Sequence, residues 1–318
     1  MAFCSRLLAE AFGLGLGAGC STVFDDYTSS TPAGVLSSSG VPQGRGHVYL
    51  IRGLIGEVFS RGLDSLAEKI QRQGIPATVH SSYSTGALAE KVIQNYRREP
   101  GPIILIGHST GGDVAISIAK QLRASNIPVG IIFGFDPTPI AGQVPDNVEL
   151  FINLFQKTNP IGGGVVKSGG GFNGRLINVD LREHSDIVHI TLDKSSRIHN
   201  AVVEEIIGYV SAARSQNGSV AQVGYQQPPA ANYIRPYFLA YVVPPNEPIQ
   251  IFDSGIQVAA NGGESVKTIA DNYRVPVWLL AQVNRLDPNT PLAPGKQLIV
   301  PQHMYGEIIS GGVSSFAR

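Results

Sequence analysis

The stretch Ile103-Ile104-Leu105-Ile106-Gly107-His108-Ser109-Thr110-Gly111-Gly112 decides the fold of most of the chain. Its apolar first half is typical of a buried strand in a parallel sheet. Apolar residues then recur at helical spacing, which predicts a helix that begins close to Ser109. A serine in such a strand-to-helix turn is presented at the edge of a sheet, where it can act as a nucleophile. The helical positions are Val114, Ala115, Ile118, Ala119 and Leu122.

A serine hydroxyl needs a general base, and the chain has seven histidines that could supply one. His199 follows the apolar segment 187–192, which we expect to be a strand, and precedes a segment with helical spacing at 202–210. A base just past a late strand can reach the serine turn, so we predict His199 as the base. We interpret three other histidines as structural: His108, His184 and His189.

Three aspartates compete for the role of the acid that orients the base. Asp136 ends the apolar run 129–135, which we expect to be the strand after the nucleophile's helix. The next predicted strand is followed by no carboxylate, and this favours Asp136. Asp180 ends a further predicted strand and is the second choice, whereas Asp193 is too near the predicted base along the chain to fold back on it.

Two backbone N–H groups are needed to stabilise the oxyanion that forms during attack on a carbonyl. The residue after the nucleophile, Thr110, supplies the first. The second is expected from the loop after an early strand. Residues 47–51 are predicted to be that strand, and Leu54 follows it in the sequence Arg52-Gly53-Leu54. We therefore predict Leu54 and Thr110 as the oxyanion-hole donors.

Residues 45–213 resemble an α/β-hydrolase domain, with GHSTG as the nucleophile elbow and RGL in place of the usual His-Gly-x motif. An acid after the strand that follows the nucleophile's helix is similar to the thioesterases of polyketide and nonribosomal synthesis, and to some lipases. The resemblance implies an α/β three-layer sandwich with a mostly parallel sheet. It also implies hydrolysis of an ester or thioester through an acyl-enzyme, with no cofactor and no metal. The family's substrate range is too broad to name a substrate.

The C-terminal segment 256–302 predicts a second, smaller domain of the βααβ type. A short strand at 256–258 precedes a helix that Ser265 caps, and a second helix begins after Pro276 and stops at Asn284. A Pro294-Gly295 turn leads into the last strand, 297–300. The segment holds no pair of carboxylates, no metal-ligand cluster and no nucleophile with a base, so we expect it to bind and not to catalyse. Trp278 is expected to pack rather than to stack on a sugar.

This segment resembles a LysM domain in the sequences GGES, IADNY, VNRLDPN and PGKQLIVP. The resemblance implies binding of N-acetylglucosamine-containing glycans, chiefly peptidoglycan, in a shallow groove between two loops. Much of that recognition is by backbone groups. The positions that the resemblance assigns to the groove are Gly263, Glu264, Ser265, Asn284, Leu286 and Asp287.

Both cysteines, Cys4 and Cys20, fall within the first twenty residues. Residues 1–20 resemble a bacterial lipoprotein signal with Cys20 as the lipidated residue, and a plain secretory signal is the alternative. Residues 21–44 are expected to be a disordered tether. Membrane attachment is then through the N-terminal lipid, and the location is the cell envelope, in the periplasm.

The composition bounds the partners and the remaining segments. Formal net charge is zero, with 24 basic and 24 acidic side chains, which argues against a nucleic-acid partner. Residues 214–255 are rich in Pro and Gln and are expected to be a linker, part of which packs as a strand, and 303–318 are a tail. The sequence thus predicts an exported serine hydrolase held on peptidoglycan. The alternative is a wall-binding lipoprotein whose hydrolase-like domain is a scaffold.

Overall fold

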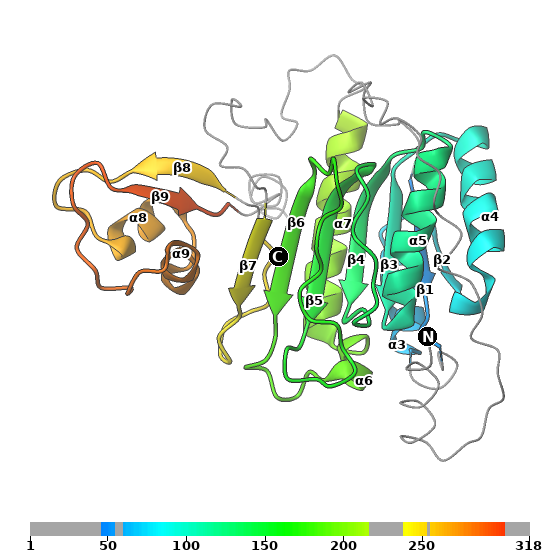
Figure 1. The fold of residues 1–318 in the computed structure, drawn as a ribbon, viewed down its shortest axis with the longest axis horizontal. Coiled ribbons are helices and arrows are strands. Elements are labelled where there is room, and N and C mark those ends of the chain that lie inside the picture. The colour runs from blue at the N-terminus through cyan, green and yellow to red at the C-terminus, as the bar shows by residue number, and fades with distance from the viewer. Residues whose placement is uncertain (1–45, 55–59, 216–237, 253–254, 303–318) are drawn as a thin grey trace, which may run out of the picture. The chain divides into compact units, whose positions relative to one another are not determined.

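The computed structural model describes residues 46–54, 60–215, 238–252 and 255–302. Seven parallel strands form the main sheet, in the order β2-β1-β3-β4-β5-β6-β7 (Figure 1). The strand order reverses direction at β1, so the loops that follow β1 and β3 lie side by side at the carboxyl edge of the sheet. The strands are β1 (His47–Ile51), β2 (Ala77–His80), β3 (Ile103–His108), β4 (Val129–Phe135), β5 (Val148–Phe155), β6 (Arg175–Asp180) and β7 (Phe238–Val242).

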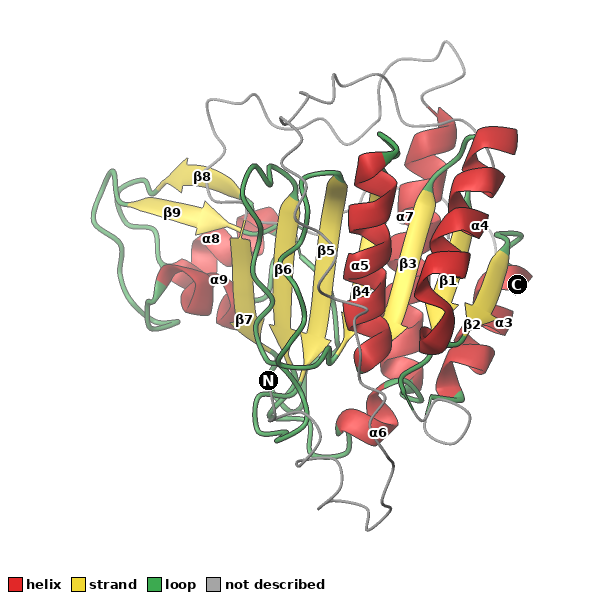
Figure 2. Cartoon of the chain, turned by 45° about the vertical axis from the view of Figure 1, so that its right-hand side comes forward, coloured by secondary structure: helices red, strands yellow, loops and turns green. Residues whose placement is uncertain are grey.

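Helices cover both faces of this sheet and make three layers (Figure 2). Helices α3 (Gly62–Arg72) and α7 (Ser196–Ser215) pack on one face, and α4 (Thr85–Arg98) and α5 (Thr110–Ala124) on the other. Each face has its own apolar core, because side chains alternate along a strand. The structure therefore confirms the predicted α/β class with a parallel sheet in three layers. Two short elements, the 3-10 helix η1 (Ser82–Ser84) and α6 (His189–Leu192), lie at the carboxyl edge.

Glycines bring α5 very close to the strands beneath it. A Cβ placed on Gly111 would lie 2.1 Å from the carbonyl oxygen of Ile51 in β1. A Cβ on Gly107 would lie 2.1 Å from the carbonyl oxygen of Gly111 itself. Both distances are far below a van der Waals contact, so only glycine fits at these two positions. The glycines of the elbow sequence thus set the separation between sheet and helix.

The crossover from β5 to β6 contains no helix, and a chain segment covers the sheet in its place. Its glycine-rich stretch is tied to two buried asparagines of the strands, Asn153 and Asn178. Asn153 Nδ2 donates to the carbonyl oxygen of Gly164 at 2.7 Å, and the backbone N–H of Val166 donates to Asn178 Oδ1 at 2.9 Å. The segment is therefore anchored on the sheet along its length.

Residues 255–302 form the βααβ unit that the sequence predicts. Its strands β8 (Ile256–Ala259) and β9 (Gln297–Val300) pair in antiparallel fashion, and helices α8 (Val266–Tyr273) and α9 (Val277–Asn284) lie between them in the chain. Ser265 caps α8, as expected, by accepting a hydrogen bond from the Thr268 N–H at 3.2 Å. The unit has its own small apolar core.

Two local expectations are wrong or incomplete. Residues 187–192 are not a strand, because their second half forms the short helix α6. The range 214–255, expected to be a linker, contains β7, which completes the sheet as its edge strand. Gln282 of α9 contacts this strand, since its side-chain amide accepts from the Val242 N–H at 3.0 Å and donates to the Val242 carbonyl at 2.9 Å. Trp278 packs against Tyr241 of β7 with ring centroids 6.0 Å apart.

We predict that Gly111→Ala lowers the free energy of unfolding by about 3 kcal/mol or more, because the added methyl group must displace the backbone of β1. Gly86→Ala in α4 is the matched control, since a Cβ there meets nothing within 4 Å. The control should raise stability by up to about 1 kcal/mol, because alanine favours a helix. Urea unfolding of the two variants checks this, and equal stability of both would contradict the close packing of α5 on β1.

Candidate functional site

Ser109 lies in a strained turn between β3 and α5. Its φ is +56°, in a region that residues with a side chain rarely adopt. Two backbone hydrogen bonds hold the turn: the Ser109 N–H donates to the Phe135 carbonyl at 2.9 Å, and the Gly112 N–H donates to the Ser109 carbonyl at 2.8 Å. Such strain costs about 1–3 kcal/mol and persists where the surroundings impose it. The geometry is that of a nucleophile elbow, with a half-buried serine.

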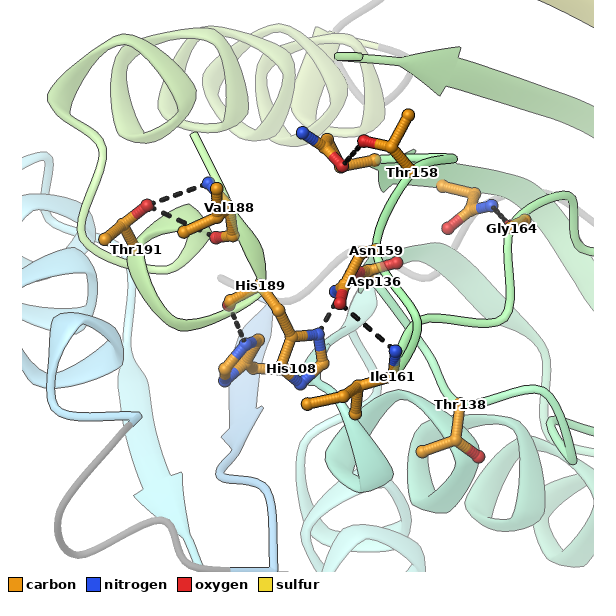
Figure 3. Close-up of polar contacts among 12 residues, drawn as sticks. His108, Asp136, Thr138, Thr158, Asn159, Ile161, Gly164, Val188, His189 and Thr191 are labelled. Atoms are coloured by element: carbon orange, nitrogen blue, oxygen red, sulfur yellow. Dashed lines mark hydrogen bonds and ion pairs between the residues drawn. The ribbon is translucent and has the colours of Figure 1, made fainter. Parts of the chain in front are cut away.

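Asp136 and His189 form a buried pair at the carboxyl ends of β4 and β6. His189 Nδ1 lies 2.9 Å from Asp136 Oδ2, and the aspartate is completely buried (Figure 3). Asp136 directly follows Phe135, the residue that accepts the hydrogen bond from Ser109, so the pair adjoins the elbow. With Nδ1 donating to the carboxylate, the Nε2 atom of His189 is the basic nitrogen. The acid expected from the sequence is thus brought together with a histidine.

That histidine is not His199, the base that the sequence analysis favours. His199 lies in α7, and its Nε2 contacts the backbone carbonyl of Asp193 at 2.6 Å. Spacing in the sequence could have shown this, because His199 shares one helical stripe with Val202, Ile206 and Val210, which are all core residues. The structure assigns His199 to the buried face of α7 and leaves His189 as the candidate base.

The other candidate acids have different partners. Asp180 pairs with Arg182 at the end of β6. Asp193 accepts a hydrogen bond from the Gly62 N–H at 2.9 Å and so joins the start of α3 to the segment before α7. His184 contacts Arg197 at 3.1 Å. These residues stabilise the loop that carries His189 rather than forming a second catalytic group.

Two residues that sequence reasoning did not single out hold Asp136 in place. Asn159, after β5, donates from Nδ2 to Asp136 Oδ2 at 2.6 Å (Figure 3). Gly162 lies against the same carboxylate so closely that a Cβ on it would be 2.1 Å from Asp136 Oδ1. Asn159 occupies the strand end at which the sequence shows no carboxylate, and this vacancy was the available signal.

His108, next to the nucleophile, joins the loops on either side of Ser109. Its Nε2 lies 2.8 Å from the His189 carbonyl, and its Nδ1 lies 2.8 Å from Ser60 Oγ. Ser60 Oγ in turn accepts from the Gly53 N–H at 3.2 Å. Burial and the neighbouring His189 lower the pKa of His108 to about 4, so it is neutral at physiological pH. A neutral ring with its proton on Nε2 satisfies every contact in this chain.

The two predicted oxyanion donors lie on opposite sides of Ser109. Thr110 is the first residue of α5, where backbone N–H groups point out of the helix. Leu54 follows Gly53, and a Cβ placed on Gly53 would be 3.2 Å from Ser109 Cβ. Leu54 is held by Tyr83, whose hydroxyl donates to the Leu54 carbonyl. The structure therefore brings the loop of Leu54 to the nucleophile.

Asp113, in the first turn of α5, connects the elbow to the loop that carries the acid. Its carboxylate accepts from the Thr138 N–H at 3.1 Å and from Thr138 Oγ1 at 2.6 Å. Burial raises the pKa of Asp113 to about 7, although the hydrogen bonds from Thr138 act in the opposite direction. Thr138 lies two residues after Asp136, so this contact fixes the exit of β4.

In the small domain, the two loops of the predicted glycan groove lie together. The Leu292 N–H donates to the Glu264 carbonyl at 3.0 Å, and Ser265 pairs with Pro291 in an isolated bridge. Asn284 is engaged within the domain, because its side chain bonds the carbonyl of Leu280 and both backbone groups of Ile299. Of the remaining groove positions, Gly263 has φ +84°, Leu286 packs on the domain's core, and Asp287 accepts from the Asn289 N–H.

A cavity of about 390 Å³ lies at the opposite edge of the main sheet, lined by His47, Tyr49, Asn95 and Tyr96 among others. It is far from the elbow in the fold, because it borders the amino ends of β1 and β3. Within the described ranges, no group of three or more His, Cys, Asp or Glu side chains is arranged to hold a metal ion. None of the helices described there combines the length and apolar character that crossing a membrane requires.

Comparison with known proteins gives one family match and several similar folds. Residues 262–301 match the LysM domain family and form a LysM domain. Searching curated protein sequences gives no match to the chain.

Similar solved structures include an α/β-superfamily hydrolase from Xanthomonas campestris pv. campestris, described as putative in its title (16% identity, 54% of this chain and 99% of that one, TM-score 0.33). They also include the NocB thioesterase domain from the nocardicin cluster (20% identity, 31% and 48%, TM-score 0.22) and human thioesterase 2 (16% identity, 31% and 43%, TM-score 0.22). The chain thus spans about half of the nocardicin domain. The α/β class itself rests on the sheet order and the three layers.

We predict that the stability of the protein falls as pH rises from about 4 through about 7, in part because of Asp113. The folded carboxyl binds its proton more tightly than the unfolded one, whose pKa is the ordinary 3.8. In that window the unfolded state therefore loses the proton first, and this group lowers stability by at most about 1.4 kcal/mol per pH unit. Asp113→Asn keeps the shape of the side chain and should remove this part of the slope. Urea unfolding at pH 5 and pH 8 measures it, and an unchanged slope in the variant would contradict the assignment.

Proposed function

We propose that the chain is a serine hydrolase that cleaves an ester or thioester, with Ser109 as nucleophile, His189 as general base and Asp136 as the orienting acid. The observation that carries the proposal is the buried Asp136–His189 contact of 2.9 Å beside an elbow serine with φ +56°. A buried carboxylate is costly unless a partner uses it, and here the partner is a histidine at the sheet edge where the nucleophile is presented. Asp136 is retained from the sequence analysis, and His189 replaces His199.

The proposed reaction follows from these positions. His189 Nε2 takes the proton of Ser109 Oγ as that oxygen attacks the carbonyl carbon of the substrate, while Asp136 stabilises the imidazolium. The N–H groups of Thr110 and Leu54 are placed to bind the resulting oxyanion. The imidazolium then gives its proton to the departing alcohol or thiol. Water, activated by the same histidine, releases the acid from the acyl-enzyme and restores Ser109.

The LysM domain suggests where this chemistry takes place. We propose that residues 262–301 bind N-acetylglucosamine-containing glycans, chiefly peptidoglycan, and hold the hydrolase domain at the cell wall. The pairing of the Glu264 and Leu292 segments supports a groove there. Export and lipidation of Cys20 complete the hypothesis of a periplasmic protein with a lipid anchor. Cys20 lies outside the described residues, so this part stays a prediction from the sequence.

We predict that His189→Ala and Ser109→Ala each lower ester turnover by at least about a thousandfold, because proton transfer or the nucleophile is lost. His199→Ala is the matched control, since the structure gives His199 a contact only within the packing of α7, and it should keep turnover within a few fold. Hydrolysis of a soluble butanoyl ester and labelling of Ser109 by a fluorophosphonate measure the effect.

The same pair of variants tests the histidine assignment. Loss of turnover in the folded His199→Ala variant, with His189→Ala active, would favour the base expected from the sequence over the one in the structure. A folded wild-type protein that neither labels nor turns over any ester would leave the wall-binding scaffold as the function. Circular dichroism of each variant separates lost chemistry from lost folding.

We predict that the full-length protein sediments with insoluble peptidoglycan and that soluble chito-oligosaccharides release it. Asn284→Ala should abolish the sedimentation, because the loop that forms one side of the groove loses its three hydrogen bonds to the domain. Asn272→Ala, an exposed asparagine of α8, is the control and should sediment normally. Equal sedimentation of both variants would argue against the groove as the binding site.

A further inference from the structure

Exposed apolar side chains gather at one edge of the hydrolase domain. Within the described residues, nine large apolar side chains are exposed, and six of them lie in segments that follow the carboxyl ends of strands. We call these six the apolar collar. Since all strands of the main sheet are parallel, these segments surround the edge that presents Ser109. The collar consists of Leu54, Tyr83, Ile140, Ile161, Val188 and Ile190.

Contacts connect each part of the collar to the proposed catalytic groups. Val188 and Ile190 flank His189 in the sequence. The Ile161 N–H donates to Asn159 Oδ1 at 3.1 Å, and Asn159 in turn holds Asp136. Figure 3 shows the Ile161 side chain reaching toward the His189 ring. The collar residues on this side are thus one residue or one hydrogen bond away from the groups that would do the chemistry.

The remaining collar residues lie on the side of the proposed oxyanion donors and beyond the acid. Leu54 is itself one of those donors, and Tyr83 bonds its carbonyl, leaving the tyrosine ring 73% exposed. Ile140 is 62% exposed, and its N–H lies 3.4 Å from Thr138 Oγ1. Exposure of this extent costs free energy in water, and clustering of such residues around a site marks a surface that an apolar ligand covers.

The charged side chains closest to the collar are paired with one another. Arg197 pairs with Asp186, and Arg182 pairs with Asp180, both within the segment that carries His189. Lys194 donates to the carbonyl of Ile190 at 2.8 Å. These pairings leave the apolar side chains as the surface that the segment offers to a substrate at the edge.

We propose that the apolar collar binds the hydrocarbon part of the acyl group, so that the substrates are esters or thioesters of medium- and long-chain acids. This inference rests on the proposed serine hydrolase function and goes further, because it selects among acyl groups. A small polar substrate, such as an acetyl group on a glycan, leaves most of the collar in water. A long acyl chain esterified to Ser109 covers it.

The test is the dependence of kcat/KM on acyl chain length, measured on the full-length protein with acetyl, butanoyl, octanoyl and dodecanoyl thioesters below their micelle concentrations. A half-covered methylene should raise kcat/KM about twofold, against about fourfold for a completely buried one. Ile161→Ser and Ile190→Ser should each lower the ratio of dodecanoyl to butanoyl turnover by about tenfold. Tyr273→Ser, an exposed apolar residue of α8 in the LysM domain, is the matched control and should leave that ratio unchanged.

The outcomes separate this inference from the function on which it rests. Fluorophosphonate labelling of Ser109 with a flat chain-length profile overturns the collar as an acyl site and leaves the hydrolase proposal standing. A profile that is flat below the micelle concentration and rises above it overturns binding of single chains in favour of docking on a lipid surface. The absence of labelling and of turnover with every ester overturns the hydrolase proposal itself.

Discussion

The close approach of α5 to β1 and β3 is the constraint on which the rest of the hydrolase domain depends. Side chains at Gly107 or Gly111 would collide with backbone, so the helix can sit there only if both positions lack one. That proximity forces the sharp turn at Ser109 and places its positive φ. The α5 N-terminus, the Phe135 carbonyl and the acid after β4 then converge on one point of the sheet edge. The strain at Ser109 is offset by packing along the whole of α5.

A chain of hydrogen bonds through His108 gives this convergence its rigidity. The chain runs from the Gly53 N–H through Ser60 and His108 to the carbonyl of His189. It therefore ties the loop of one proposed oxyanion donor to the residue proposed as the base, with the nucleophile between them. A charged His108 would disrupt it, because Nδ1 could no longer accept from Ser60. Its low pKa keeps the connection intact at neutral pH.

The elements with strong periodic patterns could be predicted from the sequence, and the placement of the base could not. The buried strands at 103–108 and 129–135, the helix after Ser109 and the βααβ unit follow from local apolar patterns. Asp136 could be found because it ends a strand. His189 was missed because the segment 187–192 alternates like a strand, whereas tertiary contacts such as that with Asp136 fold it as a turn and a short helix. Asn159 and Ser60 act only through residues distant in the sequence.

Strand β7 has one neighbour in the sheet, β6, and its outer edge would otherwise present unpaired backbone groups. The amide of Gln282 occupies part of that edge by bonding both backbone groups of Val242, and Leu279 of α9 joins the core of the larger domain. The LysM domain thus also protects an open sheet from adding a foreign strand. A hydrolase fragment cut off before α9 would expose this edge and would be prone to self-association, even though every proposed catalytic residue is present in it.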